Sequence, residues 1–121
     1  MTYWSDPPED FTTAMTTAGG PYTIGLSVPT GFQVEAIFNA FAASSTGNAY
    51  VYYLSDDVTD EVPSISGAPT PSFHCDTAGG GSQYEVITNT SGQIKGDVSN
   101  QNLGTHRITT IGWRTYRGHG F

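Results

Sequence analysis

The residues best suited to chemistry in this chain are the acids of one short run, residues 56–61 (Asp-Asp-Val-Thr-Asp-Glu). Several carboxylates on one flexible loop are what Ca²⁺ requires. The run lacks the Asp-x-Asp-x-Asp-Gly spacing of the known calcium loop, and neighbouring side chains of an extended backbone point to opposite sides. We therefore expect a solvated turn, or an acidic surface that pairs with arginines of another copy. Its acids are Asp56, Asp57, Asp60 and Glu61.

A second candidate is the tripeptide His74-Cys75-Asp76. These residue types bind metals, but a zinc site needs further ligands at a regular spacing, which His106 and His119 do not provide. A nucleophile and its base usually come from distant segments, and no phosphate-binding loop, nucleophile elbow or His-Glu-x-x-His motif is present. Nothing selects a pair of carboxylates for glycoside hydrolysis. The chain is predicted not to be an enzyme, and no metal or cofactor is expected.

The charges are divided unevenly along the chain. Residues 1–94 carry ten acids and no base, a charge of −10, whereas residues 95–121 carry four bases and one acid, a charge of +3. This division makes the two parts of one chain complementary to each other, and equally makes one copy complementary to the next. The four bases are Lys95, Arg107, Arg114 and Arg117.

Large aromatic residues accompany this basic part and also occur close to residue 1. Trp, Tyr and Arg dominate the hot spots of protein interfaces because they combine apolar area with a polar or charged tip. On a regular strand Ile111, Trp113 and Thr115 would share one face, where Ile111 and Trp113 could equally be core. We predict an assembly surface. Its residues are Tyr3, Trp4, Phe11, Trp113, Arg114, Tyr116, Arg117 and Phe121.

Composition excludes several classes of protein. The net charge of −7 argues against nucleic-acid binding, which needs clustered Lys and Arg. No stretch approaches the ~18 apolar residues of a membrane span. Cys75 is the only cysteine, so we expect no disulfide and a thiol that is half-buried or in a loop. The first eight residues lack the features of a signal peptide, which predicts synthesis in a cytoplasm.

Strands are predicted where apolar and polar residues alternate between turn signals. Residues 1–21, rich in Pro, Gly and Thr, are expected to form an extended arm without regular structure, docked on its own domain or, preferably, on a neighbour. Residues 32–42 and 49–54, separated by a Gly-containing turn, are expected to pair as a hairpin. The segment 55–82 is interpreted as a long surface excursion with a short strand at 72–75. Further strands are expected at 22–28, 84–88, 93–98 and 105–116.

Six or seven strands without a helix, at this spacing of turns, predict an all-β fold. We expect an antiparallel β-sandwich, jelly-roll-like, as a single domain over residues 22–121 with the extended N-terminal arm at 1–21.

The ending Ile111-Gly112-Trp113-x-x-x-Arg117-Gly118 resembles the close of small β-sandwich virion proteins of tailed bacteriophages. The resemblance covers residues 108–118. Thr115 and Tyr116 depart from the pattern, at positions where such endings carry an acid and a base. The resemblance implies a small protein that decorates the capsid or the tail, usually as a trimer and without chemistry of its own.

These observations predict a capsid decoration (cement) protein that is made in the host cytoplasm and located in the virion. Its expected partners are further copies of itself, as a homotrimer, and the major capsid protein or another virion protein. The alternative is a tail-fibre tip or carbohydrate-binding module that attaches to the host. Its stacking platforms would be Tyr50, Tyr52, Tyr53 and Trp113.

Overall fold

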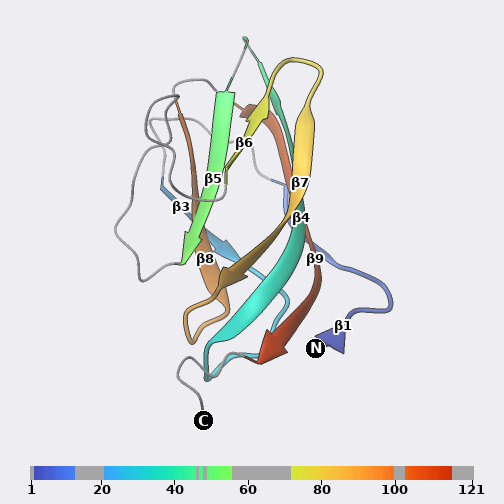
Figure 1. Ribbon diagram of the computed structural model, residues 1–121, viewed down its shortest axis with the longest axis vertical. Helices are drawn as coiled ribbons and strands as arrows, with labels where there is room; N and C mark the ends of the chain where they lie inside the picture. Colours follow the sequence, from blue (N-terminus) through green and yellow to red (C-terminus); the bar gives the residue numbers. More distant parts are fainter. Residues whose placement is uncertain are drawn as a thin grey trace.

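A computed structural model of the chain describes residues 2–12, 21–45, 47, 49–55, 72–99 and 103–115, with 72–74 described for the backbone alone. All regular structure in this part of the chain is β (Figure 1). The strands are β1 (Thr2–Tyr3), β2 (Glu9–Phe11), β3 (Tyr22–Gly25), β4 (Val34–Ser44), β5 (Ala49–Ser55), β6 (Ser72–Cys75), β7 (Gly80–Ile87), β8 (Gln93–Val98) and β9 (Leu103–Thr115).

The strands form two antiparallel sheets that face each other as a sandwich (Figure 1). Sheet A has the order β1-β9-β4-β7, with β2 also paired to β9, and sheet B has the order β3-β8-β5-β6. The chain changes sheet at most connections, and among the described strands only the β1–β2 and β5–β6 connections stay within one sheet. The predicted all-β antiparallel sandwich is therefore confirmed.

The predicted hairpin of residues 32–42 and 49–54 is wrong. Strand β4 pairs with β7 and β9 in sheet A, whereas β5 pairs with β6 and β8 in sheet B. The short polar connection between them crosses from one sheet to the other, a distance of about 10 Å. A turn containing Gly can serve either a hairpin or such a crossing, so its composition does not distinguish the two. The predicted strand at 72–75 is confirmed as β6.

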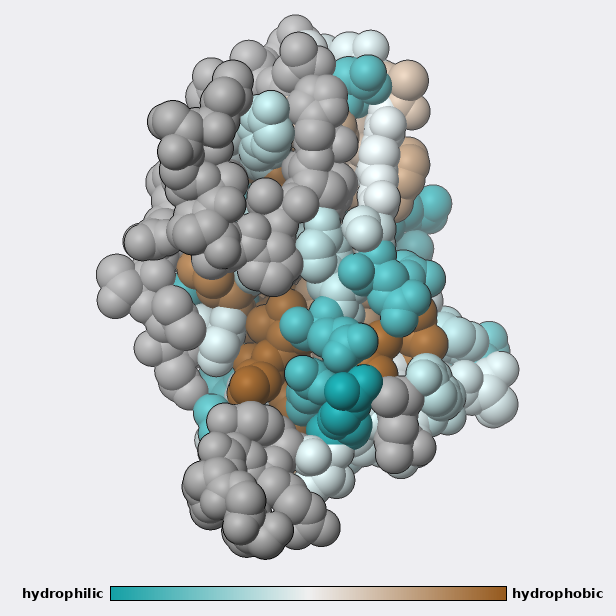
Figure 2. All heavy atoms as spheres, in the orientation of Figure 1, coloured by the Kyte–Doolittle hydropathy of each residue, from teal (hydrophilic) through white to brown (hydrophobic). Residues whose placement is uncertain are grey.

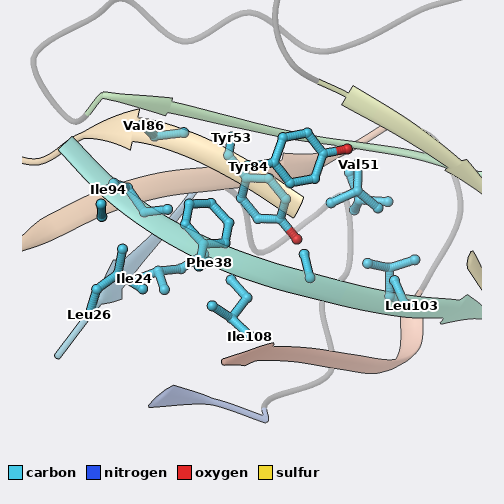
Figure 3. Close-up of a cluster of buried hydrophobic side chains, with 14 of the residues drawn as sticks. Ile24, Leu26, Phe38, Val51, Tyr53, Tyr84, Val86, Ile94, Leu103 and Ile108 are labelled. Atoms are coloured by element: carbon cyan, nitrogen blue, oxygen red, sulfur yellow. The ribbon is translucent and has the colours of Figure 1, made fainter. Parts of the chain in front are cut away.

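The core is built on an aromatic group that both sheets contribute. Phe38 of β4, Tyr53 of β5 and Tyr84 of β7 meet with ring centroids 5.2 to 5.9 Å apart (Figure 3). Phe38 and Tyr53 lie edge to face, at an interplanar angle of 88°, the geometry that aromatic quadrupoles favour. Aliphatic residues of both sheets surround this group. They include Ile24, Leu26, Val51, Val86, Ile94, Leu103 and Ile108.

A β-bulge in β9 changes which side chains face the core. Ile37 pairs with Gly112 and Phe38 with Thr110, so Ile111 is an extra residue without a partner position in β4. Before the bulge, Thr110 lies opposite the core residue Phe38; after it, Trp113 lies opposite the core residue Ala36. The bulge therefore places Trp113 on the inner side of sheet A and breaks the alternation expected for this segment.

Gly112 provides a test of the pairing between β1 and β9. A Cβ at this position would overlap the carbonyl oxygen of Thr2 and lie 2.9 Å from the Cα of Tyr3, both of them backbone atoms. We expect Gly112→Ala to displace β1 and to lower the free energy of unfolding by about 1–3 kcal/mol. Urea unfolding followed by tryptophan fluorescence measures the change.

Gly104→Ala is the matched control in the same strand, because the nearest atom to its Cβ would be the Cβ of Ser45 at 3.6 Å, an ordinary contact. Equal stability of the two variants would contradict a close approach of β1 to Gly112.

Candidate functional site

The residues predicted for assembly near the N-terminus lie along β9 of their own chain. In β1, Thr2 pairs with Trp113 and Tyr3 with Gly112. The backbone N–H of Trp4 donates to the carbonyl of Ile111 at 2.7 Å. Residues 2–12 are thus held by strand pairing, in contrast to the arm without regular structure that was expected. The reason is that β9 has a second edge, opposite β4, whose backbone groups need partners.

Aromatic contacts hold the same arm to its own domain. The rings of Trp4 and Trp113 meet edge to face with centroids 5.6 Å apart, and Phe11 packs on the ring of His106 at 5.1 Å. The sequence interpretation preferred a neighbouring subunit for this arm, and in the structure Trp4 and Phe11 dock on their own chain instead. Tyr3 and Trp4 remain 60% and 40% exposed.

A carboxylate in the arm connects the two sheets. One oxygen of Asp10 accepts from the backbone N–H of Ser27 at 2.7 Å, and the other accepts from the Ser27 hydroxyl at 2.6 Å. The hydroxyl of Thr110, in β9, donates to the same carboxylate. The indole N–H of Trp4 donates to the carbonyl of Ser27 at 2.8 Å. We call Trp4, Asp10, Ser27 and Thr110 the arm clasp, because they join β9 of sheet A to the residues that follow β3 of sheet B.

Removal of the central carboxylate tests the arm clasp. Hydrogen bonds to a charged group contribute about 1.5–3 kcal/mol each, and Asp10→Ala removes three that are partly exposed. We expect a loss of about 2–4 kcal/mol in the free energy of unfolding, together with faster hydrogen exchange in β1 and β2. Asp6→Ala, an exposed acid of the same arm, should leave both quantities unchanged. An equal effect of the two substitutions would mean that the clasp does not hold the arm.

A buried Tyr–His pair lies beneath the arm. The hydroxyl of Tyr53 and Nε2 of His106 are 2.5 Å apart, and neither residue is exposed to solvent. Burial lowers the pKa of His106 to about 4, and burial also raises the pKa of Tyr53 well above its usual value. Both groups are therefore neutral at pH 7, and we interpret the pair as a hydrogen bond of the core that Phe11 covers.

The stability of the fold should depend on this histidine. An unfolded chain binds a proton on His106 below about pH 6.5, whereas the folded chain does so only near pH 4. Because the folded pKa is lowered, the stabilisation is complete above pH 6.5 and is lost as the pH falls toward 4, by about 3 kcal/mol in total.

Urea unfolding at intervals from pH 7.5 to 4.5 measures this loss, and His106→Gln should remove most of the slope between pH 6.5 and 4.5. Parallel pH profiles of the parent and the variant would show that another group causes the dependence.

The thiol of Cys75 differs from the expectation of a half-buried or loop position. It belongs to β6 and is 1% exposed. Burial, followed by the nearby charge of Asp76, raises the pKa of the thiol. A protonated, buried thiol is a poor nucleophile, so Cys75 acts as a small core residue. No group of three or more His, Cys, Asp and Glu within the described ranges could hold a metal ion.

Two arginines of the basic part, Arg107 and Arg114, form ion pairs with glutamates of the acidic part of the same chain. The guanidinium of Arg107 lies 3.2 Å from Glu9, and that of Arg114 lies 2.9 Å from Glu35 and 3.3 Å from Glu85. Of the two complementarities that the divided charge allows, the one within a chain is present for these residues. The pairs are largely exposed and contribute little to stability.

The two glutamates that Arg114 contacts line a surface groove of about 230 Å³ between β5 and β7. The groove is lined by Glu35, Tyr53, Leu54, Ser55, Glu85, Val86 and Ile87. Figure 2 shows a hydrophobic area beside strongly polar residues on this side of the sandwich. Sequence analysis did not single out Glu35 or Glu85, nor the clasp residues Asp10, Ser27 and Thr110, because the strands that bring them together pair only over long distances in the sequence.

The predicted assembly residues thus separate into two groups. Tyr3, Trp4, Phe11 and Trp113 lie where the arm meets β9, whereas Arg114 pairs with two glutamates of the groove lining. The others lie outside the described residues and stay predictions: Tyr116, Arg117 and Phe121, and the acidic surface of Asp56, Asp57, Asp60 and Glu61.

The stacking platform proposed for a carbohydrate-binding module is not available as expected. Tyr52 and Tyr53 have no exposed surface, while Tyr50 and Trp113 are partly exposed. A sugar ring could therefore reach only two of the four residues.

Comparisons with protein-family models, curated proteins and solved structures find no match. Within the described part of the chain, no helix is long and apolar enough to cross a membrane.

Proposed function

We propose that this protein is a non-enzymatic structural protein of a virion, a capsid decoration protein with a jelly-roll fold. The strand order supports the jelly roll. If the arm strands β1 and β2 count as one position, each sheet has four positions, and the chain alternates between sheets in the manner of two wound Greek keys. This fold is common among capsid domains.

The observation that carries the proposal is the exposure of large aromatic side chains. Phe41 is 44% exposed, in addition to Tyr3 and Trp4. Aromatic residues are enriched at protein interfaces, and apolar groups clustered on a surface mark contact sites. Three such residues on one sheet of a domain with a well-packed core favour a protein that is covered by partners in its working state.

The outward face of sheet A is the best candidate for the contact. Phe41 pairs with Arg107 and Gly81, and its ring lies close to Gly79, where an added Cβ would be 3.0 Å from Cε1. Tyr3 pairs with Gly112, which lies opposite Ile37, a residue on the same face as Phe41 and four residues before it in β4. The ion pairs of Arg107 and Arg114 flank these two aromatic residues. An aromatic centre with charged neighbours is the usual anatomy of a protein interface.

The partners in this proposal are two further copies, as a homotrimer, and the major capsid protein or another virion protein. The resemblance of residues 108–118 to phage virion proteins and the exposed aromatics support it. The attachment alternative, a tail-fibre tip or carbohydrate-binding module, has less support since Tyr52 and Tyr53 are buried.

The test is binding to shells that lack the protein. Purified protein is mixed with shells of the parent phage, and binding is measured by co-sedimentation and electron microscopy, with the oligomeric state determined by light scattering after size exclusion. We expect a trimer that decorates the shells, and Phe41→Ser should weaken binding at least about tenfold, a loss of 1.4 kcal/mol.

Phe32→Ser, an equally exposed phenylalanine in the connection before β4, is the matched control and should bind normally. Circular dichroism confirms that both variants fold. A monomer that does not bind shells, or binding to glycans on an array instead, would contradict the proposal.

A further inference from the structure

The two edges of the sandwich differ in the contacts that join sheet A to sheet B. At one edge β2 contacts β3, and the arm clasp joins the two sheets. At the other edge β7 contacts β6, but β6 begins at Ser72, opposite Tyr52. The last three residues of β5 therefore extend past β6, and the groove lies between them and the end of β7.

The groove combines an apolar lining with two glutamates. Its apolar lining comes from Leu54 and Val86, both buried, and from the half-buried Ile87. Glu35 and Glu85 share the single guanidinium of Arg114, so this wall keeps one net negative charge. An apolar lining beside a net negative wall fits an aromatic or aliphatic group that is joined to a cation.

We propose that the groove binds residues 116–121 of a second copy of this chain. That segment reads Tyr-Arg-Gly-His-Gly-Phe, with one arginine, no acid and an aromatic residue at either end. Its charge and apolar groups complement those of the groove, whose acids belong to the acid-only part of the chain. The segment is a docking element in this proposal, and Glu85 is the acid that its arginine approaches.

The choice of a second copy follows from symmetry and rests on the proposed function. A cyclic trimer requires a heterologous contact, in which one patch of each copy meets a different patch of the next. The groove and residues 116–121 are two such different patches. Thr115, the last residue of β9, follows Arg114, whose guanidinium contacts Glu35 and Glu85 of the groove lining.

Crosslinking of the full chain tests the proposal. Phe121→p-benzoylphenylalanine is introduced, light and ¹⁵N-labelled copies are mixed, and the protein is irradiated and digested for mass spectrometry. We expect adducts that join position 121 of one isotope to residues of β5 or β7 of the other. Adducts confined to a single isotope, adducts elsewhere on the chain, or no adduct would each overturn the proposal.

Matched variants make the test specific to the groove. Ser55→Trp should fill the groove and reduce the mixed-isotope adduct at least about tenfold, whereas Gln83→Trp, an exposed position of β7 outside the groove, should not. Glu85→Gln should also reduce the adduct. Its control is Glu9→Gln, since Glu9 is similarly exposed (42% against 45%) and is also paired with an arginine. Equal yields within each pair would overturn the proposal.

Failure of docking in the groove and failure of the decoration function would give different results. Shells decorated normally by Ser55→Trp trimers would refute docking in the groove and leave the decoration function intact. A mixed-isotope adduct in a protein that never binds shells would support the docking and refute that function.

Discussion

The antiparallel pairing of β4 with β9 is the interaction on which the rest of the structure depends. It joins residues 34–44 to residues 103–115, and these two strands form the middle of sheet A. One free edge of the pair accepts β7, and the other accepts both strands of the arm. Because the pairing joins segments about 70 positions apart in the sequence, it gives the fold a high proportion of long-range contacts, which slows folding.

The bulge at Ile111 gives this pairing a second consequence. It shifts the alternation of β9, so that Trp113 lies on the inner side of sheet A, where the indole of Trp4 packs against it, and Arg114 lies on the outer side with Glu35 and Glu85. Without the extra residue, Trp113 would lie on the outer side and Arg114 on the inner side. Adjacent residues of one strand thereby contribute to two different surfaces.

The acidic and basic regions of the chain form ion pairs with each other within a single copy. Arg107 meets Glu9 of β2, and Arg114 meets Glu35 of β4 and Glu85 of β7, because β9 pairs with β2 and β4, and β4 in turn pairs with β7. Two arginines contact three acids, so these ion pairs keep one net negative charge and leave complementary contacts to a partner. In our proposal that partner is another copy, whose residues 116–121 bring the missing cation.

Alternation of apolar and polar residues was enough to predict the strand at 93–98, the strand that begins near residue 105, the all-β class and the short strand at 72–75. These properties are local, since a period of two arises from the geometry of a single strand. Alternation does not predict which strands pair with each other. The connection between β4 and β5 was predicted to form a hairpin, but it crosses from one sheet to the other. The arm clasp and the groove also went unpredicted, because Asp10 meets Ser27 and Thr110, and Glu35 meets Arg114, only after distant strands have paired.

The sequence by itself determined that this chain folds as β-strands, that its charges are divided between two regions, and that both of its ends carry large aromatic residues. Composition and periodicity are properties of the unfolded chain, and they carry over into any fold that it adopts. Only the tertiary structure decided that the arm docks on its own β9 and that the side chains of Tyr53 and His106 are buried. It also decided that two glutamates share one arginine beside an open groove. Those outcomes depend on which strand edges meet, and the free energy that selects the pairing is spread over the whole core.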